Sequence, residues 1–254
     1  MDKKRFISLL GVALMMGGLM GCACPPKDPV ALQAYQENND PFEPTNRAIF
    51  GFNQVVDDYV LTPLVKGYRA VVPEGIRTGI LNFVDNLKAP LYAGNSLLQG
   101  DGHNALEQTK KFTFNTLFGF FGFFRPSDTA GIVAETADFG QTLGKYGVGE
   151  GPYLVLPVIG PSNVRDTAGM VVDAVAMPSD FALKEVDPTL PYVRSGVDGF
   201  ARRASADALL QSLKDSSTDY YATLRSMYRQ NRNKKIGKDG ADAYEYDFDF
   251  EDED

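Results

Sequence analysis

The sequence predicts an all-α protein. Between residues 191 and 235, apolar side chains recur at steps of three and four, the spacing of amphipathic helices. Nearer the N-terminus, proline and glycine divide the chain into short helical segments. Sustained period-two alternation, typical of half-buried strands, is rare. Residues 153–157 and part of 131–151 are the candidates for short strands, so little β structure is expected.

The first predicted helices are bounded by prolines. A cap at residues 45–46 begins a helix that reaches about Leu61 and ends before Pro63. Pro73 lies near the start of a second helix, and Pro90 begins a third, because proline is well tolerated in a first helical turn.

Glycines mark the later boundaries. A turn at residues 100–102 precedes a helix that starts near Asn104. We expect Gly196, Gly199 and the polar run 214–219 to divide residues 191–235 into two helices.

The N-terminal end has the pattern of a bacterial lipoprotein signal. A positive block at residues 3–5 precedes the apolar run 6–20, which is too short for a comfortable membrane span. The run ends at Leu-Met-Gly-Cys, which resembles a lipobox and predicts acylation of Cys22. Cys24 is the poorer candidate, because Gly21 would then occupy the place of a branched apolar residue.

A plain secretory signal with two cysteines left to pair is the alternative. Ala23 alone separates Cys22 from Cys24, so a disulfide between them would close a strained loop. In lipoproteins that resemble this one, an aspartate after the acylated cysteine favours retention at the inner membrane. Ala23 in that place indicates export to the outer membrane, where several acyl chains would hold the protein firmly.

The chain divides into four predicted parts. These are a signal peptide (1–21), a polar tether (22–39), one helical domain (40–236) and a disordered acidic tail (237–254). From Asp239 onward the tail has nine acidic and no basic residues, so it accounts for the formal net charge of −8. Aromatic residues alternate with the acids there, and a docking strip for a basic partner is the alternative to disorder.

Residues 112–124 contain seven phenylalanines and leave little polar surface for water. A helix that is apolar all round is buried in a core or lies in lipid, and this one is too short to span a bilayer. We favour a position in one membrane leaflet over an ordinary core, since a domain of this size has difficulty covering so many rings. The residues predicted to be embedded are Phe112, Phe114, Phe118, Phe120, Phe121, Phe123 and Phe124.

Three stretches resemble the MlaA/VacJ family of outer-membrane lipoproteins. The first is an acidic-proline element with an Asn-Arg pair and an aromatic helix, at residues 40–53. The second is the Phe-Asn-Thr run with spaced glycines, at 112–122. The third and most specific lies at 138–166, with DFGQTLG, YGVG, GPY, LP, GPS and RD in the family's order. Together they cover most of residues 40–173.

The resemblance implies a ring-like bundle of short amphipathic and apolar helices lying in one leaflet, the inner leaflet of the outer membrane. It implies an amphipathic channel through which phospholipid headgroups reach the periplasm, and association with a trimeric porin. It also implies transfer to a soluble periplasmic lipid carrier, so that mislocalised phospholipid leaves the outer leaflet and lipid asymmetry is maintained. No chemical bond is made or broken by such a protein.

Two sets of residues are candidates for a channel or gate. Phe52 and Asn53 are placed near the channel, because aromatic and amide residues alternate there. The glycine-rich stretch with Gly140, Gly144 and Gly147 is either a movable gate or a rigid packing turn. It lacks the lysine-serine pair and the preceding strand of a phosphate-binding loop.

The residues give little support to an enzyme. His103 is the single histidine, no nucleophile elbow occurs, and we assign no catalytic residue, cofactor or metal ligand. Dispersed basic residues argue against nucleic-acid binding. The remaining alternative is a structural or ligand-binding periplasmic lipoprotein that is held at the membrane only by its lipid anchor.

Overall fold

The computed structural model describes residue 28 and residues 38–237, and the all-α prediction is confirmed. The first long element is α3 (Glu43–Val56), continued by a π-helical turn η1 (Asp57–Leu61) and by α4 (Thr62–Val71). The prediction of a helix end before Pro63 was wrong. At η1 the amide of Thr62 donates to the carbonyl of Asp57, so Pro63 falls in the first turn of α4, where its missing amide hydrogen costs little.

Helix α5 (Glu74–Leu98) starts after Pro73, as predicted, but it runs without interruption through Pro90. The predicted third helix at Pro90 is therefore wrong. An interior proline disfavours a helix by about 3 kcal/mol. Packing offsets this cost, because α5 packs against the shorter helix α6 (Gly102–Phe118) and also touches three other helices.

The remaining elements follow in chain order: α7 (Pro126–Thr129), α8 (Phe139–Lys145), β1 (Tyr153–Leu156), β2 (Gly160–Asn163), α9 (Val164–Ala176), α10 (Pro178–Val186), α11 (Leu190–Ser205), α12 (Asp207–Ser216) and α13 (Tyr220–Lys235). The two strands form an antiparallel hairpin in which Tyr153 faces Asn163. The C-terminal region forms three helices instead of the predicted two. It breaks at Ala206 and at residues 217–219, while Gly196 and Gly199 lie inside α11.

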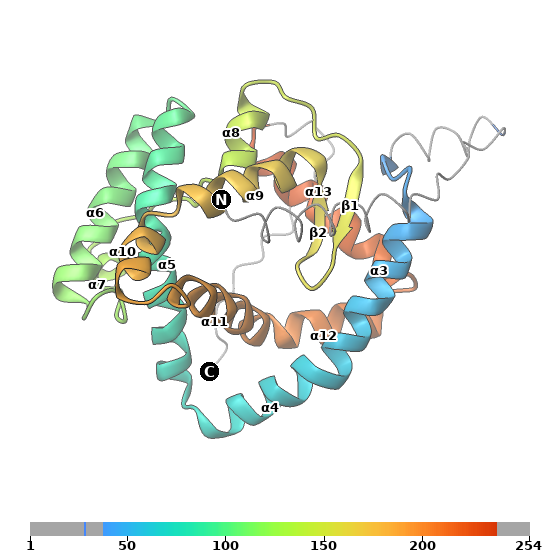
Figure 1. Cartoon of the computed structure of the whole chain (residues 1–254), viewed down its shortest axis with the longest axis horizontal. Coiled ribbons are helices and arrows are strands. Elements are labelled where there is room, and N and C mark those ends of the chain that lie inside the picture. The colour runs from blue at the N-terminus through green and yellow to red at the C-terminus, as the bar shows by residue number, and fades with distance from the viewer. Residues whose placement is uncertain (1–27, 29–37, 238–254) are drawn as a thin grey trace.

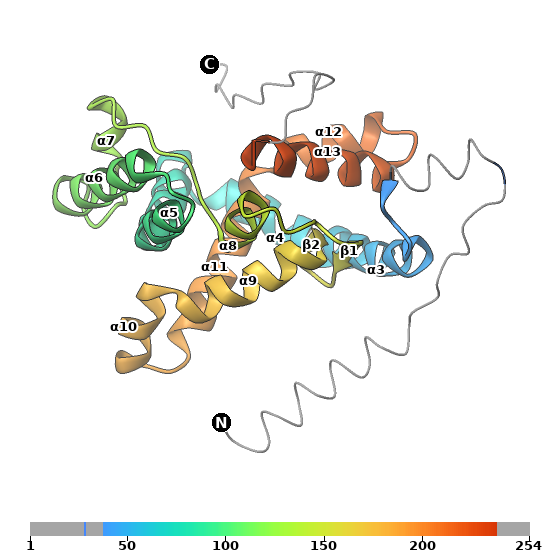
Figure 2. The ribbon, with the colours of Figure 1, turned by 90° about the horizontal axis from the view of Figure 1, so that it is seen from above.

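The elements follow one another in a closed ring (Figure 1). The path runs through α3, η1 and α4 into α5, then by contact to α8, α9, β2 and β1, and from β1 back to α3. Helices α11, α12 and α13 lie across this ring, with α11 against α4 and α5 and α13 against β2. The view from above places α9 and α10 on one side of the ring and α12 and α13 on the other (Figure 2).

The phenylalanine run is not one continuous helix. Helix α6 ends at Phe118, and Phe120, Phe121 and Gly122 follow with left-handed backbone angles (φ of 50°, 58° and 91°). This turn brings the chain back against α5, where the ring of Phe123 fills the space above Gly79. Phe118, Phe120, Phe121 and Phe124 are each at least 60% exposed.

Helices α8 and α9 cross at two glycines. A Cβ atom on Gly169 would lie 2.3 Å from the backbone nitrogen of Gly140, so neither backbone could keep its position. Buried polar side chains surround this crossing, while a small apolar cluster of Tyr153, Val155 and Tyr221 lies where the hairpin meets α13.

We expect Gly169→Ala to destabilise the fold by about 1–3 kcal/mol, the usual cost of overpacking, and to lower the midpoint of thermal unfolding in detergent. Gly196→Ala is the matched control, because no atom lies within 4 Å of its added Cβ. In a helix interior that change should be neutral or stabilising by up to about 1 kcal/mol. Equal midpoints for the two variants would contradict the close crossing of α8 and α9.

Candidate functional site

Polarity is distributed in an unusual way within residues 38–237. Seventeen polar or charged residues are buried there, against thirteen apolar ones, and thirty-one large apolar side chains are exposed. Soluble domains bury mainly apolar residues and rarely leave large contiguous apolar patches in water. The helices of this protein instead direct polar groups at one another and apolar groups outward.

The exposed apolar side chains gather on particular elements. One group lies at the end of α6 and in the turn after it, and another follows α9, α10 and the start of α11. The second group comprises Val171, Val172, Val175, Phe181, Val186, Tyr192 and Val193. Within the described part of the chain, no helix combines the length and the apolar character needed to cross a bilayer.

A buried aspartate joins the two ends of the fold. Asp40 is 2% exposed and accepts hydrogen bonds from Asn46 Nδ2 at 2.7 Å, from Arg225 Nη1 at 2.8 Å and from the hydroxyl of Tyr221. We call these four residues the Asp40 clamp. Since Tyr221 and Arg225 belong to α13, the clamp holds the last helix against the segment that precedes the first.

Two asparagines attach α3 to the hairpin. The amide of Asn46 donates to the carbonyl of Tyr153 and accepts from the amide of Val155, at 3.0 Å each. Two turns further along, Asn53 donates to the carbonyl of Leu156 and accepts from the amide of Val158, at 2.9 and 2.7 Å. Both side chains therefore pair with β1 as a neighbouring strand would.

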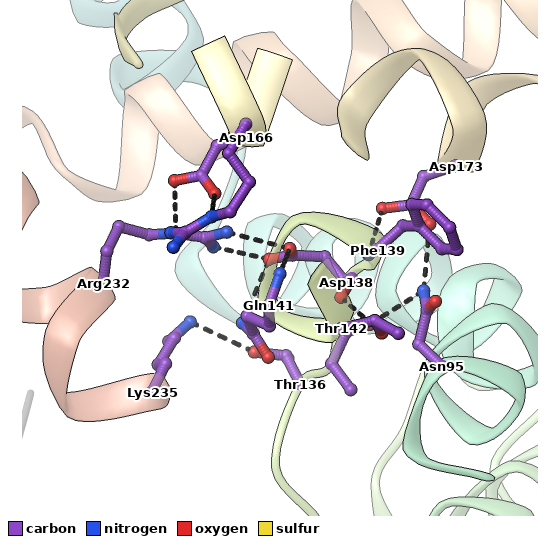
Figure 3. Close-up of polar contacts among 12 residues, drawn as sticks. Asn95, Thr136, Asp138, Phe139, Gln141, Thr142, Asp166, Asp173, Arg232 and Lys235 are labelled. Atoms are coloured by element: carbon purple, nitrogen blue, oxygen red, sulfur yellow. Dashed lines mark hydrogen bonds and ion pairs between the residues drawn. The ribbon is translucent and has the colours of Figure 1, made fainter. Parts of the chain in front are cut away.

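A second clamp holds α13 against α8 and α9 (Figure 3). Arg232 donates to both carboxylate oxygens of Asp138, at 2.6 and 2.9 Å, and its Nε lies 2.8 Å from Asp166. Asp166 also accepts from Arg165 at 2.9 Å and from the hydroxyl of Tyr228 at 2.5 Å. We call Asp138, Asp166 and Arg232 the Arg232 clamp.

Ion pairs also connect α11 and α12 to the opposite sides of the ring. Arg203 donates to Asp57 of η1 at 2.8 Å, and Lys214 donates to Asp58 at 2.6 Å. On the other side, two pairs join α5 to α11, between Lys88 and Asp198 and between Asp85 and Arg202. The Lys88–Asp198 pair is the most shielded of the four, with both side chains 15% exposed, whereas Lys214 and Asp58 are more than 40% exposed.

The pKa values of two buried aspartates reflect this pairing. Burial opposes the ionisation of Asp166, but hydrogen bonds from Arg232, Tyr228 and Arg165 outweigh it, and its pKa lies below the ordinary value. The same balance, with Lys88 and Arg202 as donors, lowers the pKa of Asp198. Asp173 differs: burial is the largest effect and raises its pKa, although it accepts from Asn95 and from the amide of Phe139.

The predicted channel and gate residues lie in two places. Phe52 is 53% exposed on α3, whereas the amide of Asn53 is bound to the hairpin. Gly140 and Gly144 are buried in α8, close to Asp166 and Arg165, and Gly147 occupies the turn after α8 with φ of 86°. The structure does not bring the two sets together, and Cys22 lies outside the described residues.

Sequence reasoning missed the clamps. Asp40 and Arg225 are 185 positions apart, and Asp138 and Arg232 are 94 apart. Arg225 and Arg232 do lie seven residues apart on one face of α13, a spacing that points to a shared charged face. Nothing in their own segment identifies the aspartates that they bind.

The fold and this polarity define a membrane-associated helical protein. A family model for the MlaA lipoprotein matches residues 38–235. The intermembrane phospholipid transport system lipoprotein MlaA of Escherichia coli (strain K12) is 33% identical over 234 residues, which cover 89% of this chain and 88% of that protein. The Haemophilus influenzae protein of the same name is 34% identical over 204 residues, which cover 79% and 80%. The chain belongs to the MlaA lipoprotein family, as its sequence motifs predicted.

A solved structure from work on the structural basis for maintenance of bacterial outer membrane lipid asymmetry has the same fold. It is 34% identical, with a TM-score of 0.64, over 78% of this chain and 98% of that one.

The lowered pKa values of Asp166 and Asp198 predict acid sensitivity. Their folded pKa values lie below the unfolded value of about 4. Their contribution to stability is therefore complete above that pH and is lost as the pH falls through the folded values. Thermal unfolding midpoints measured in detergent from pH 7 to pH 3 should fall steeply below about pH 4. Asp166→Asn should unfold earlier at pH 7 and show a flatter decline.

Asp215→Asn is the control, since Asp215 is exposed on α12. It should retain the wild-type midpoint at pH 7 and the wild-type decline. The same slope in wild type and Asp166→Asn would rule out this role for Asp166.

Proposed function

We propose that the protein is an outer-membrane lipoprotein that removes mislocalised phospholipid from the outer leaflet through an amphipathic channel bounded by the ring of helices. The observation that carries this proposal is the reversed polarity, with polar residues buried and apolar ones exposed. A lipid moved through such a ring needs a polar route for its headgroup and apolar surroundings for its tails. Family membership supplies the substrate class, since the named relatives are intermembrane phospholipid transport lipoproteins.

The ring itself is proposed to lie in the periplasmic leaflet. Its exposed apolar residues favour lipid over water by roughly 25 cal/mol per Å² of apolar surface removed from water. Phe118, Phe120, Phe121 and Phe124 supply one such surface, and α9 to α11 supply another. Since no described helix is suited to cross the bilayer, these elements would lie along one leaflet, as amphipathic helices do.

Acylated Cys22 would provide the anchor, followed by the tether 22–39. The remaining steps rest on the family resemblance: association with a trimeric porin and delivery of lipid to a soluble periplasmic carrier. Together they would maintain the lipid asymmetry of the outer membrane. We assign no catalytic step, because moving a lipid along a polar path requires no bond to be broken.

Deleting the gene should raise the amount of phospholipid in the outer leaflet, which enzymatic labelling of surface lipid measures. The wild-type chain should restore asymmetry, and Cys22→Ser should not, because it lacks the acylated residue. Cys24→Ser is the matched control and should restore it fully. An unchanged outer leaflet after deletion, in a strain with no second copy, would leave the structural lipoprotein as the better account.

The embedded position predicts that Cys22→Ser still partitions with membranes after alkaline carbonate washing. Adding Phe120→Asn and Phe121→Asn should increase the fraction released, because two of the exposed rings are lost while Phe118, Phe124 and the surface on α9 to α11 remain. Both positions have left-handed backbone angles, which asparagine adopts more readily than phenylalanine. Release therefore cannot be ascribed to backbone strain.

Val158→Asn in the same Cys22→Ser background is the control for that experiment. Val158 is 66% exposed and also left-handed (φ of 66°), but its hairpin turns toward the centre of the ring (Figure 1). This variant should stay with the membrane. Complete solubility of Cys22→Ser alone would show that the anchor is the only attachment.

A further inference from the structure

A cavity of about 160 Å³ lies between α5 and α6, where the segment after α7 crosses them. Both views place α6 on the side of α5 away from the centre of the ring (Figures 1 and 2). The cavity therefore lies on the outer side of α5. An engineered protein cavity of about 150 Å³ admits benzene, so this space suits a small polar group of similar size.

The charges that line the cavity favour an anion. Lys111 and Arg125 provide two cations and Asp85 one carboxylate. Asp85 is already paired with Arg125, at 2.8 Å, and with Arg202. No ion pair is found for Lys111 within residues 38–237, because neighbouring Glu107 pairs with Lys110 instead. The cavity therefore retains positive charge.

Two side chains that line the cavity, Asn86 and Tyr92, each have a polar atom for which no hydrogen bond is found among the described residues. Asn86 is 6% exposed, and its Nδ2 donates to Thr116 and to the carbonyl of Phe121, which fixes the orientation of the amide. Its buried Oδ1 has no partner among the described residues, which is uncommon for a buried acceptor. Tyr92 lines the same space, and burial raises the pKa of its phenol, so the hydroxyl keeps its proton.

An apolar groove lies on the same helix, α6, and shares no lining residue with the cavity. It is lined by Thr109, Lys110, Thr113, Phe114, Phe118 and Ile132. Lys111 of the cavity and Phe114 of the groove are three residues apart on α6, the spacing of neighbours on a helix surface. On the crossing segment, Ile132 lines the groove and Ala134, two residues later, lines the cavity. A ligand with a charged head and an apolar chain fits the pair.

We propose that this cavity binds the phosphate of a phospholipid headgroup and that the groove holds the acyl chain of the same lipid. The phosphate would accept hydrogen bonds from Lys111, Arg125 and Tyr92. The site is a second lipid position outside the ring. The nature of its ligand rests on the proposed transport of phospholipid, and its geometry does not.

The test is binding to the purified full-length protein in a maltoside detergent, which contains no phosphate, followed by calorimetry. Glycerophosphoethanolamine should bind, and Lys111→Gln should weaken it about ten-fold or more, the usual effect of losing a charge-assisted hydrogen bond. Tyr92→Phe should weaken it by a smaller factor. Lys66→Gln, which removes an exposed lysine on α4, is the matched control and should bind as the wild type does.

Two further ligands test the chemistry of the headgroup. Glycerophosphocholine carries the same phosphate and should bind about as tightly as glycerophosphoethanolamine. Inorganic phosphate, which lacks the glycerol, should bind more weakly. If phosphate alone binds as tightly as the two glycerol compounds, the assignment to a lipid headgroup is wrong. Equal losses in Lys111→Gln and Lys66→Gln would show nonspecific charge attraction and overturn the site.

A short-chain phosphatidylethanolamine should bind more tightly than the bare headgroup, and Phe118→Ser should remove that difference without affecting the headgroup itself. Equal affinity of the two ligands for the wild type would exclude the groove as the acyl site. All of these outcomes are independent of transport. A deletion strain with a normal outer leaflet would disprove the proposed function. The binding measurements would still decide whether the lipid site exists.

Discussion

The buried carboxylate of Asp40 is the constraint on which the ring depends. A carboxylate removed from water is costly unless charged and polar partners replace its hydration. Here Asn46, Tyr221 and Arg225 do so, and two of them belong to the last helix. The first and last segments of the domain must therefore meet before the charge of Asp40 is satisfied. The Arg232 clamp repeats this arrangement two turns further along α13.

These clamps explain how the fold is stable with so small an apolar core. Elements that are joined by paired charges and by asparagine bonds to a strand edge need few leucines between them. The apolar side chains then remain on the outside, at the end of α6 and along α9 to α11. In water this distribution would be unfavourable, while in the proposed leaflet position it would supply the attachment. The buried polar pairs that close the ring and the exposed apolar surface thus follow from one distribution of residues.

Local features of the fold could be predicted from the sequence, and long-range ones could not. The spacing of apolar residues indicated helices, and the strand at residues 153–157 was confirmed as β1. The expectation that proline bounds a helix failed at Pro63 and Pro90, because a π turn in one case and packing against α6 in the other keep the helix intact. The phenylalanine run was treated as one helix, since no rule of composition reveals the left-handed turn at Phe120.

For the candidate site too, the local features could be predicted from the sequence and the long-range contacts could not. The family motifs at residues 138–166 correspond to α8, the hairpin and the start of α9, where Asp138 and Asp166 meet Arg232. Their partner Arg232 lies on α13, outside the motifs at residues 40–173, so the sequence did not reveal this pairing. Asn53 was placed at a channel on the pattern of its neighbours. Its bonds to the hairpin became apparent only when β1 was located beside α3.

The reversed polarity changes which substitutions such a protein can tolerate over evolutionary time. In a water-soluble domain the apolar interior is restricted and the polar surface drifts freely. In the proposed leaflet position, a valine on α9 could be exchanged for leucine or phenylalanine with little effect, because fluid acyl chains adapt to the shape of a side chain. An aspartate in either clamp has no substitute of equal charge and reach. Substitutions between relatives should therefore accumulate on the hydrophobic exterior, and the buried charged residues should be the most conserved.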